Sequence, residues 1–149
     1  MIDDYEEPDI ERIAAEILDG IVGDDQIGVK LIDSADEFFR EYVETGGNLP
    51  QISDLDYILL RRTGGYLDQS TWTDIANLDV MVFTKTRSRG QKIMGEVTKR
   101  LLRAELNGFL GFHVDFVQVL NGPNPDGPQT MDDNVIEKAF EIHVRVKWL

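Results

Sequence analysis

The chain has 149 residues, 42% hydrophobic and 29% charged, which fits one folded domain that buries about 70% of its unfolded surface and excludes disordered or collagen-like proteins. The absence of cysteine excludes disulfide scaffolds, thiolate zinc sites and cysteine nucleophiles. A net charge of −13 repels phosphate and therefore argues against a protein that binds the phosphate backbone of nucleic acids. No window reaches the ~18 apolar residues of a membrane span, and the acidic start differs from a signal peptide, so we expect assembly in the cytosol.

The first part of the chain predicts a helix, a strand and a second helix. Isoleucines at helical spacing, with acidic residues in the first turn, predict a helix over residues 8–21. A short alternating segment predicts a strand over 27–32, and a capping-like start predicts a helix over 33–43. Residues 27–50 therefore form an inserted helical segment, which glycines and a proline terminate.

The next part predicts two antiparallel strands. Apolar runs over 57–62 and 78–83 are strand candidates. Between them lie Gly64 and Gly65, followed by the polar stretch 68–74. This spacing predicts a break at the glycines and a long connection between the strands.

The remainder predicts a helix and two further strands. Apolar residues at helical spacing opposite basic ones predict an amphipathic helix over 88–105. Alternating patterns predict strands over 112–119 and 140–148, with Trp148 in the core and a proline-rich loop at 121–134. The order, roughly αβαββαββ, predicts a single α+β domain over the whole chain. Its mostly antiparallel four-stranded sheet is packed by the amphipathic helix and the N-terminal helix.

Charge is distributed unevenly along the chain. Residues 1–56 hold 17 acidic and 3 basic residues, whereas residues 57–149 hold 11 acidic and 12 basic ones. Seven basic residues lie within 85–103, so we expect an acidic region and one basic helix. The basic helix fits a solvated surface, or a contact with the acidic half of another copy that closes into a ring. Nucleic-acid binding fits less well, because the helix carries no interleaved aromatic residues that would stack on bases.

Candidate catalytic groups are few. The two histidines, His113 and His143, lie on the polar sides of their strands and could face each other if those strands are neighbours. Asp79 resembles the first acid of a metal-dependent nuclease, but no Glu-X-Lys follows it. No serine lies in a nucleophile elbow. We therefore expect no enzyme activity and no cofactor.

Three features of the second half carry a resemblance to a known family. They are the Arg-X-Gly-Gly pattern that ends the segment 57–65, the Asp-Val-X-Val-Phe pattern at 79–83, and the amphipathic helix whose last turns cover 97–102. Across about residues 55–106 these features resemble the tail terminator proteins of long-tailed, siphovirus-type bacteriophages, especially those of the actinobacterial-phage type.

The resemblance implies a virion protein in the neck region of the tail. Such a subunit forms a hexameric ring on the head-proximal end of the completed tail tube, where it stops polymerisation. Its partners would be copies of itself, the tail tube protein, and a head-to-tail connector or stopper protein. It would use no cofactor, bind no membrane, and let DNA pass through the ring without specific binding.

The ring function that the resemblance implies also indicates candidate contact residues. For the subunit or tube interface we expect the loop at 121–134 and the residues Arg61, Arg62, Trp72, Arg87, Arg89 and Lys92. Surface solubility is the alternative for the basic residues, and a core position is the alternative for Trp72. For the channel wall we expect Asp24, Asp25, Asp132 and Asp133, whose charge would keep DNA from adhering.

Three other functions fit the sequence. The nearest is another connector ring, a stopper or an adaptor. A small metal-dependent nuclease or hydrolase would use His113 and His143 with nearby carboxylates. A monomeric adaptor that mimics nucleic-acid charge would present its acidic half on one exposed face.

Overall fold

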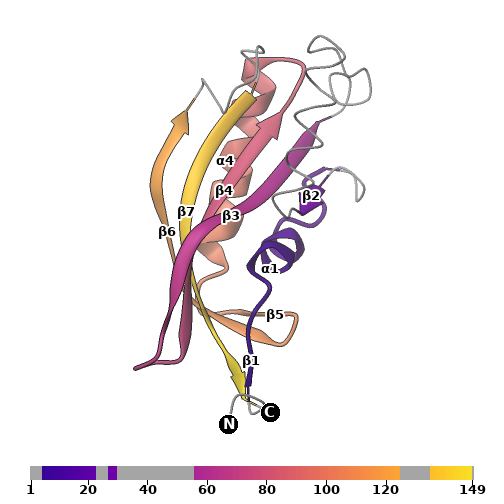
Figure 1. The fold of residues 1–149 in the computed structure, drawn as a ribbon. Coiled ribbons are helices and arrows are strands. Elements are labelled where there is room, and N and C mark those ends of the chain that lie inside the picture. Colours follow the sequence, from indigo (N-terminus) through magenta and orange to yellow (C-terminus); the bar gives the residue numbers. More distant parts are fainter. Residues whose placement is uncertain (1–4, 23–26, 30–55, 125–134, 149) are drawn as a thin grey trace.

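The computed structural model describes residues 5–22, 27–29, 56–124 and 135–148 (Figure 1). In chain order, the elements are β1 (Tyr5–Glu6), α1 (Ile10–Ile17), β2 (Ile27–Val29), β3 (Tyr57–Asp68), β4 (Thr73–Phe83), α4 (Arg87–Arg103), β5 (Gly108–Phe109), β6 (Phe112–Asn124), β7 (Val135–Arg145) and β8 (Lys147–Trp148). The expected helix at 33–43, most of the insertion at 27–50 and residues 125–134 of the expected loop lie outside the described residues.

The main sheet has the strand order β2-β3-β4-β7-β6-β5. All neighbours are antiparallel except β2 and β3, which are parallel. The predicted α+β class with a mostly antiparallel sheet is confirmed. The four expected central strands correspond to β3, β4, β7 and β6, and the short strands β2 and β5 extend the sheet to six. A separate antiparallel pair joins β1 to β8.

Strands β3 and β4 form one long hairpin rather than two strands with a long connection. Pairing continues to Asp68 and Thr73, and the expected break at the glycines is instead a register shift between Arg62 and Gly64. Gly65 has a φ of 124°, and a Cβ there would lie 2.1 Å from the Ile75 carbonyl oxygen. Glycine therefore allows a bulge inside the strand, not its end.

Both helices pack on the same face of the sheet (Figure 1). Each begins at a capping side chain: Asp9 accepts from the Arg12 N–H at α1, and Thr86 accepts from the Arg89 N–H at α4. The apolar stripe predicted for α4 is buried, and with α1 it covers the core residues of β4, β6 and β7. None of the helices in the described residues is long and apolar enough to cross a membrane.

The elongated fold has two distinct ends. At one end lie β1, β8, the β3–β4 turn and the turns on either side of β5; we call this the terminal end, because both chain termini lie there (Figure 1). At the other end α4 begins, directly after β4; we call this the helix-start end. β6 runs away from the terminal end and continues to Asn124, five residues beyond its predicted boundary.

Candidate assembly surfaces

The two histidines do not face each other, although β6 and β7 are neighbours. His143 lies opposite Phe116, with ring centroids 4.9 Å apart, and His113 lies opposite Gly108 of β5. Each imidazole instead contacts a carboxylate two residues away. His113 Nδ1 is 2.8 Å from Asp115 Oδ1, and His143 Nε2 is 2.6 Å from Glu141 Oε1.

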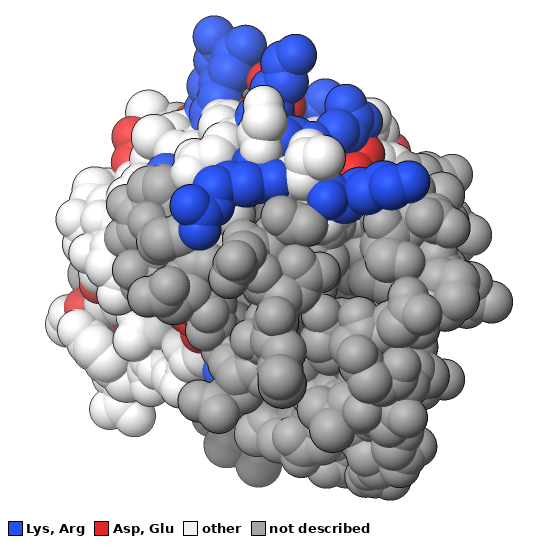
Figure 2. All heavy atoms as spheres, turned by 90° about the horizontal axis from the view of Figure 1, so that it is seen from above, with Lys and Arg blue, Asp and Glu red and all other residues white. Residues whose placement is uncertain are grey.

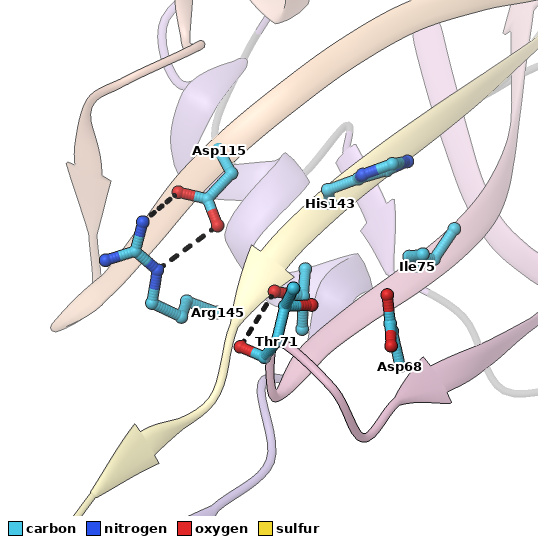
Figure 3. Close-up of a pocket in the computed structure, with 7 residues that line it drawn as sticks. Asp68, Thr71, Ile75, Asp115, His143 and Arg145 are labelled. Atoms are coloured by element: carbon cyan, nitrogen blue, oxygen red, sulfur yellow. Dashed lines mark hydrogen bonds and ion pairs between the residues drawn. The ribbon is translucent and has the colours of Figure 1, made fainter.

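An open hollow of about 550 Å³ lies beside His143 near the terminal end (Figure 3). Its lining is Asp68, Thr71, Thr73, Ile75, Asp115, His143 and Arg145. Arg145 donates to both oxygens of Asp115, at 2.7 and 3.2 Å, so these two charges neutralise each other. Figure 3 shows His143 apart from this ion pair. Within the described residues no group of three or more His, Asp or Glu side chains could hold a metal ion.

Asp79 belongs to a carboxylate pair, with Glu137 of β7 as its partner. Burial raises the pKa of Glu137, and the charge of Asp79 and a hydrogen bond with it raise that pKa further, while Arg61 lowers it. Arg61 Nη2 lies 3.7 Å from Asp79 Oδ2. Arg61, an expected contact residue, is therefore placed beside an acidic pair of its own subunit.

Arg62 is also held inside its own subunit. Its Nη1 and Nη2 donate to the two carboxylate oxygens of Asp74, each at 2.7 Å, and its Nε donates to the Gly64 carbonyl at 3.1 Å. The hydrogen bond with Asp74 raises the pKa of Arg62 above its ordinary value. Arg62 thus fixes the bulge in β3 to the buried start of β4.

Trp72 lies in the β3–β4 turn and packs within its own chain. Its ring centroid is 5.4 Å from that of Tyr5 and 5.1 Å from that of Trp148. Its carbonyl accepts from the Val146 N–H at 3.0 Å. This ring cluster joins the hairpin to β1 and β8. The expectation that Trp148 is a core residue is wrong, because 55% of it is exposed.

The described part of the helix-start end is basic. Arg87, Arg89 and Lys92 are exposed in the first turns of α4, and Figure 2 shows Lys and Arg side chains gathered along one side of this end. Arg89 Nη2 lies 2.6 Å from Asp56 Oδ2, and the hydrogen bond with Asp56 raises the pKa of Arg89. Neither Arg87 nor Lys92 forms an ion pair with another residue in the described part of the chain. This end therefore carries unbalanced positive charge among the described residues.

The most exposed large hydrophobic residues lie at the terminal end. Among the described residues, eight large hydrophobic side chains are exposed, and the four most exposed all lie at this end: Leu106 (71%), Tyr66 (63%), Trp148 (55%) and Leu110 (53%). They belong to separate segments, the β3–β4 hairpin, the turns beside β5, and β8, and exposed polar and charged residues of the same segments lie among them in sequence.

Backbone strain is concentrated at the same end. Three described residues other than glycine have a positive φ: Trp72 (53°), Leu106 (67°) and Leu110 (52°). Large L-residues rarely adopt this conformation, which glycine and asparagine adopt more readily. The sequence carries no signal for these positions, because leucine and tryptophan are not residues that mark such turns.

Among the described residues, one edge of the sheet is open. Residues 105–109 cover β6 only at its start, where Leu106 N–H donates to Val114 O at 2.7 Å and Val117 N–H donates to Glu105 Oε1 at 3.1 Å. From Gln118 to Asn124, no described residue pairs with this edge of β6. Val119 and Leu120 are exposed there. An open edge with apolar side chains can accept a strand from another chain.

The expected channel acids Asp24, Asp25, Asp132 and Asp133 lie outside the described residues. Residues 121–124 of the expected loop belong to β6. Comparison with models of known protein families finds no match, and a search of curated proteins finds none either.

Proposed function

We propose that the chain is a structural subunit of a bacteriophage virion. Copies form a ring that caps the head-proximal end of the tail tube, stops its polymerisation and provides the surface to which the head docks. The observation that carries this proposal is the chemical difference between the described parts of the two ends of the subunit: the terminal end carries the most exposed large hydrophobic side chains, and the helix-start end carries the exposed cations Arg87, Arg89 and Lys92.

A cap must bind the last layer of the tube and must not recreate the surface that it has covered. If both ends of the subunit were alike, another layer could add to the far face and growth would continue. Subunits whose two ends differ in this way, arranged side by side, would produce a ring whose two faces bind different partners. This difference supports a terminating role over that of a repeating tube subunit.

Lateral assembly would use the open edge of β6. Strand addition at Gln118 to Asn124 would satisfy the backbone groups of that edge and cover Val119 and Leu120. A ring requires that this edge meet a different surface on the next copy, because a contact between identical surfaces closes a two-fold dimer instead. The net charge of −13 suits a ring through which DNA passes without adhering.

Deletion of the gene from the phage that encodes the chain tests the proposal. A tube without its cap continues to grow, so electron microscopy should show overlong tails that lack heads, and the chain supplied in trans should restore the normal length. Tails of normal length that fail only to join heads would contradict the capping role and favour a stopper or adaptor ring.

A further inference from the structure

We propose that neighbouring copies in the ring contact each other through opposite charges: the acidic C-terminal end of α1 on one copy binds the basic last turns of α4 on the next. The acidic side consists of Glu16 and Asp19, and the basic side consists of Lys99 and Arg103. The inference rests on the proposed function, and it names the surface that lies beside the open edge of β6 in the neighbouring copy.

The two helices lie in segments of opposite charge. Residues 5–22 hold six acidic residues and one basic residue, whereas α4 holds six basic residues and one acidic residue. All four proposed contact residues are exposed. Glu16, Asp19 and Arg103 form no ion pair with another residue in the described part of the chain, and Lys99 has only Glu96, at 4.0 Å. Complementary charges that a subunit leaves unpaired are available to a second copy.

The end of α1 concentrates negative charge. No basic residue lies in its last turn, and Glu16 and Asp19 lie where the free carbonyl groups of the helix already carry partial negative charge. Acidic side chains at a helix C-terminus are unfavourable, so the isolated subunit gains no stability from them. Arg100 Nη1 donates to the Asp19 carbonyl oxygen at 2.5 Å, but this contact leaves both carboxylates without a cation among the described residues.

The positions of the helices on the sheet bring the two surfaces together. α1 packs over β2 and β3, and α4 packs over β7 and β6, on the same face of the sheet (Figure 1). On that face α4 is the helix nearer the open edge of β6, and α1 is the helix nearer the opposite margin. When copies follow one another in the same direction around a ring, α4 of one copy therefore lies next to α1 of the following copy.

The two surfaces also lie at the same height. The hydrogen bond from Arg100 to Asp19 places the end of α1 level with the last turns of α4 in each subunit. A rotation about the ring axis does not change the height of a residue along that axis. Asp19 of the next copy therefore lies level with Lys99 and Arg103, which are within one helical turn of Arg100. Exposed ion pairs are individually weak, so this contact orients the copies while strand addition at β6 holds them together.

Charge reversal on each side tests the contact. The acidic-side variant is Glu16→Lys with Asp19→Lys, and the basic-side variant is Lys99→Glu with Arg103→Glu. Supplied alone in trans to the phage that lacks the gene, each should lower the fraction of tails of normal length by about tenfold or more, because like charges then meet at every contact. Supplied together, the two variants should restore normal tails, since copies that alternate around the ring place opposite charges at every contact.

The matched controls keep the sign of each charge. Glu16→Asp with Asp19→Glu, and Lys99→Arg with Arg103→Lys, should each restore normal tails as the wild type does. Recovery by the mixture also shows that both charge-reversed variants are folded, because an unfolded chain could not complete the ring.

Each outcome has a distinct meaning. If either charge-reversed variant alone restores normal tails, the two helices are not in contact, and the capping function stands. If the mixture fails as each variant does alone, the charges serve folding or another partner, and the inference is wrong. If the wild-type chain does not restore normal tails, the proposed function fails and the inference fails with it.

Discussion

Arg62 and Asp74 face each other across the β3–β4 hairpin, with two guanidinium nitrogens each 2.7 Å from a different carboxylate oxygen. Asp74 is almost fully buried, and Arg62 also holds the bulge through Gly64. The pair therefore fixes the hairpin that leads to the terminal end.

Replacing Asp74 by alanine should lower the free energy of unfolding by about 2 kcal/mol, because two charge-assisted hydrogen bonds are lost and Arg62 is left without its partner. Urea denaturation measures the change. An exposed residue in the turn of the same hairpin provides the control, since Gln69→Ala should change stability by less than about 0.5 kcal/mol. Equal effects of the two substitutions would show that the Arg62 pair does not stabilise the hairpin.

Two glycine substitutions should change stability in opposite directions. Gly65→Ala places a Cβ 2.1 Å from the Ile75 carbonyl oxygen at a φ of 124°, so it should destabilise the fold by about 2 kcal/mol or more. Gly95 lies in α4 with nothing within 4 Å of an added Cβ, so Gly95→Ala should stabilise it by about 0.5–1 kcal/mol. Thermal melting compares the two variants, and a stabilising Gly65→Ala would contradict the bulge.

The protonation of Glu137 should make the free energy of unfolding decrease as pH rises. Burial and Asp79 raise its pKa in the folded state, so the folded chain binds this proton more tightly than the unfolded chain does. The contribution of this proton to the free energy of unfolding is complete below the ordinary pKa of glutamate. It is lost as pH rises through the raised pKa of the folded state.

The variant Glu137→Gln carries no such proton and should lose this pH dependence. Its stability relative to the wild type should therefore increase between pH 4 and pH 7 in urea titrations, whereas Glu96→Gln, on the exposed face of α4, should show no such trend. A constant difference between the Glu137 variant and the wild type would contradict the carboxylate pair.

Val144→Asp should unfold the subunit. Val144 is fully buried between Val114 on β6 and Asp74 on β4, so an unpaired charge would enter the core. Circular dichroism should show loss of the cooperative transition, whereas Arg145→Ala, at the next position on the exposed side, should stay folded. A folded Val144→Asp variant would mean that β7 presents its other face to the core.

Periodicity in the sequence was sufficient to predict the central architecture. Apolar runs identify β3 and β4, alternating residues identify β6 and β7, and the apolar stripe from Ile93 to Leu101 identifies α4, because each pattern extends over several residues. β5 and the β1–β8 pair have only two residues per strand, which is too short for any period to be detected. The glycines at 64 and 65 suggested a strand end because glycine marks ends and bulges alike.

The candidate surfaces could be predicted only in part. The basic start of α4 follows from composition. The pairing of Arg62 with Asp74 and the separation of His113 from His143 both depend on strand register, which the sequence does not specify. The positive φ values of Leu106 and Leu110 oppose local preference, so no propensity could have indicated them.

Cryo-electron microscopy of phage particles that contain the chain would test the proposed function most directly. The proposal predicts a ring of this subunit between the tail tube and the neck, with the terminal end and the start of α4 on opposite faces of the ring. Density for this chain elsewhere in the particle, or both ends of the subunit on the same face of the ring, would contradict it.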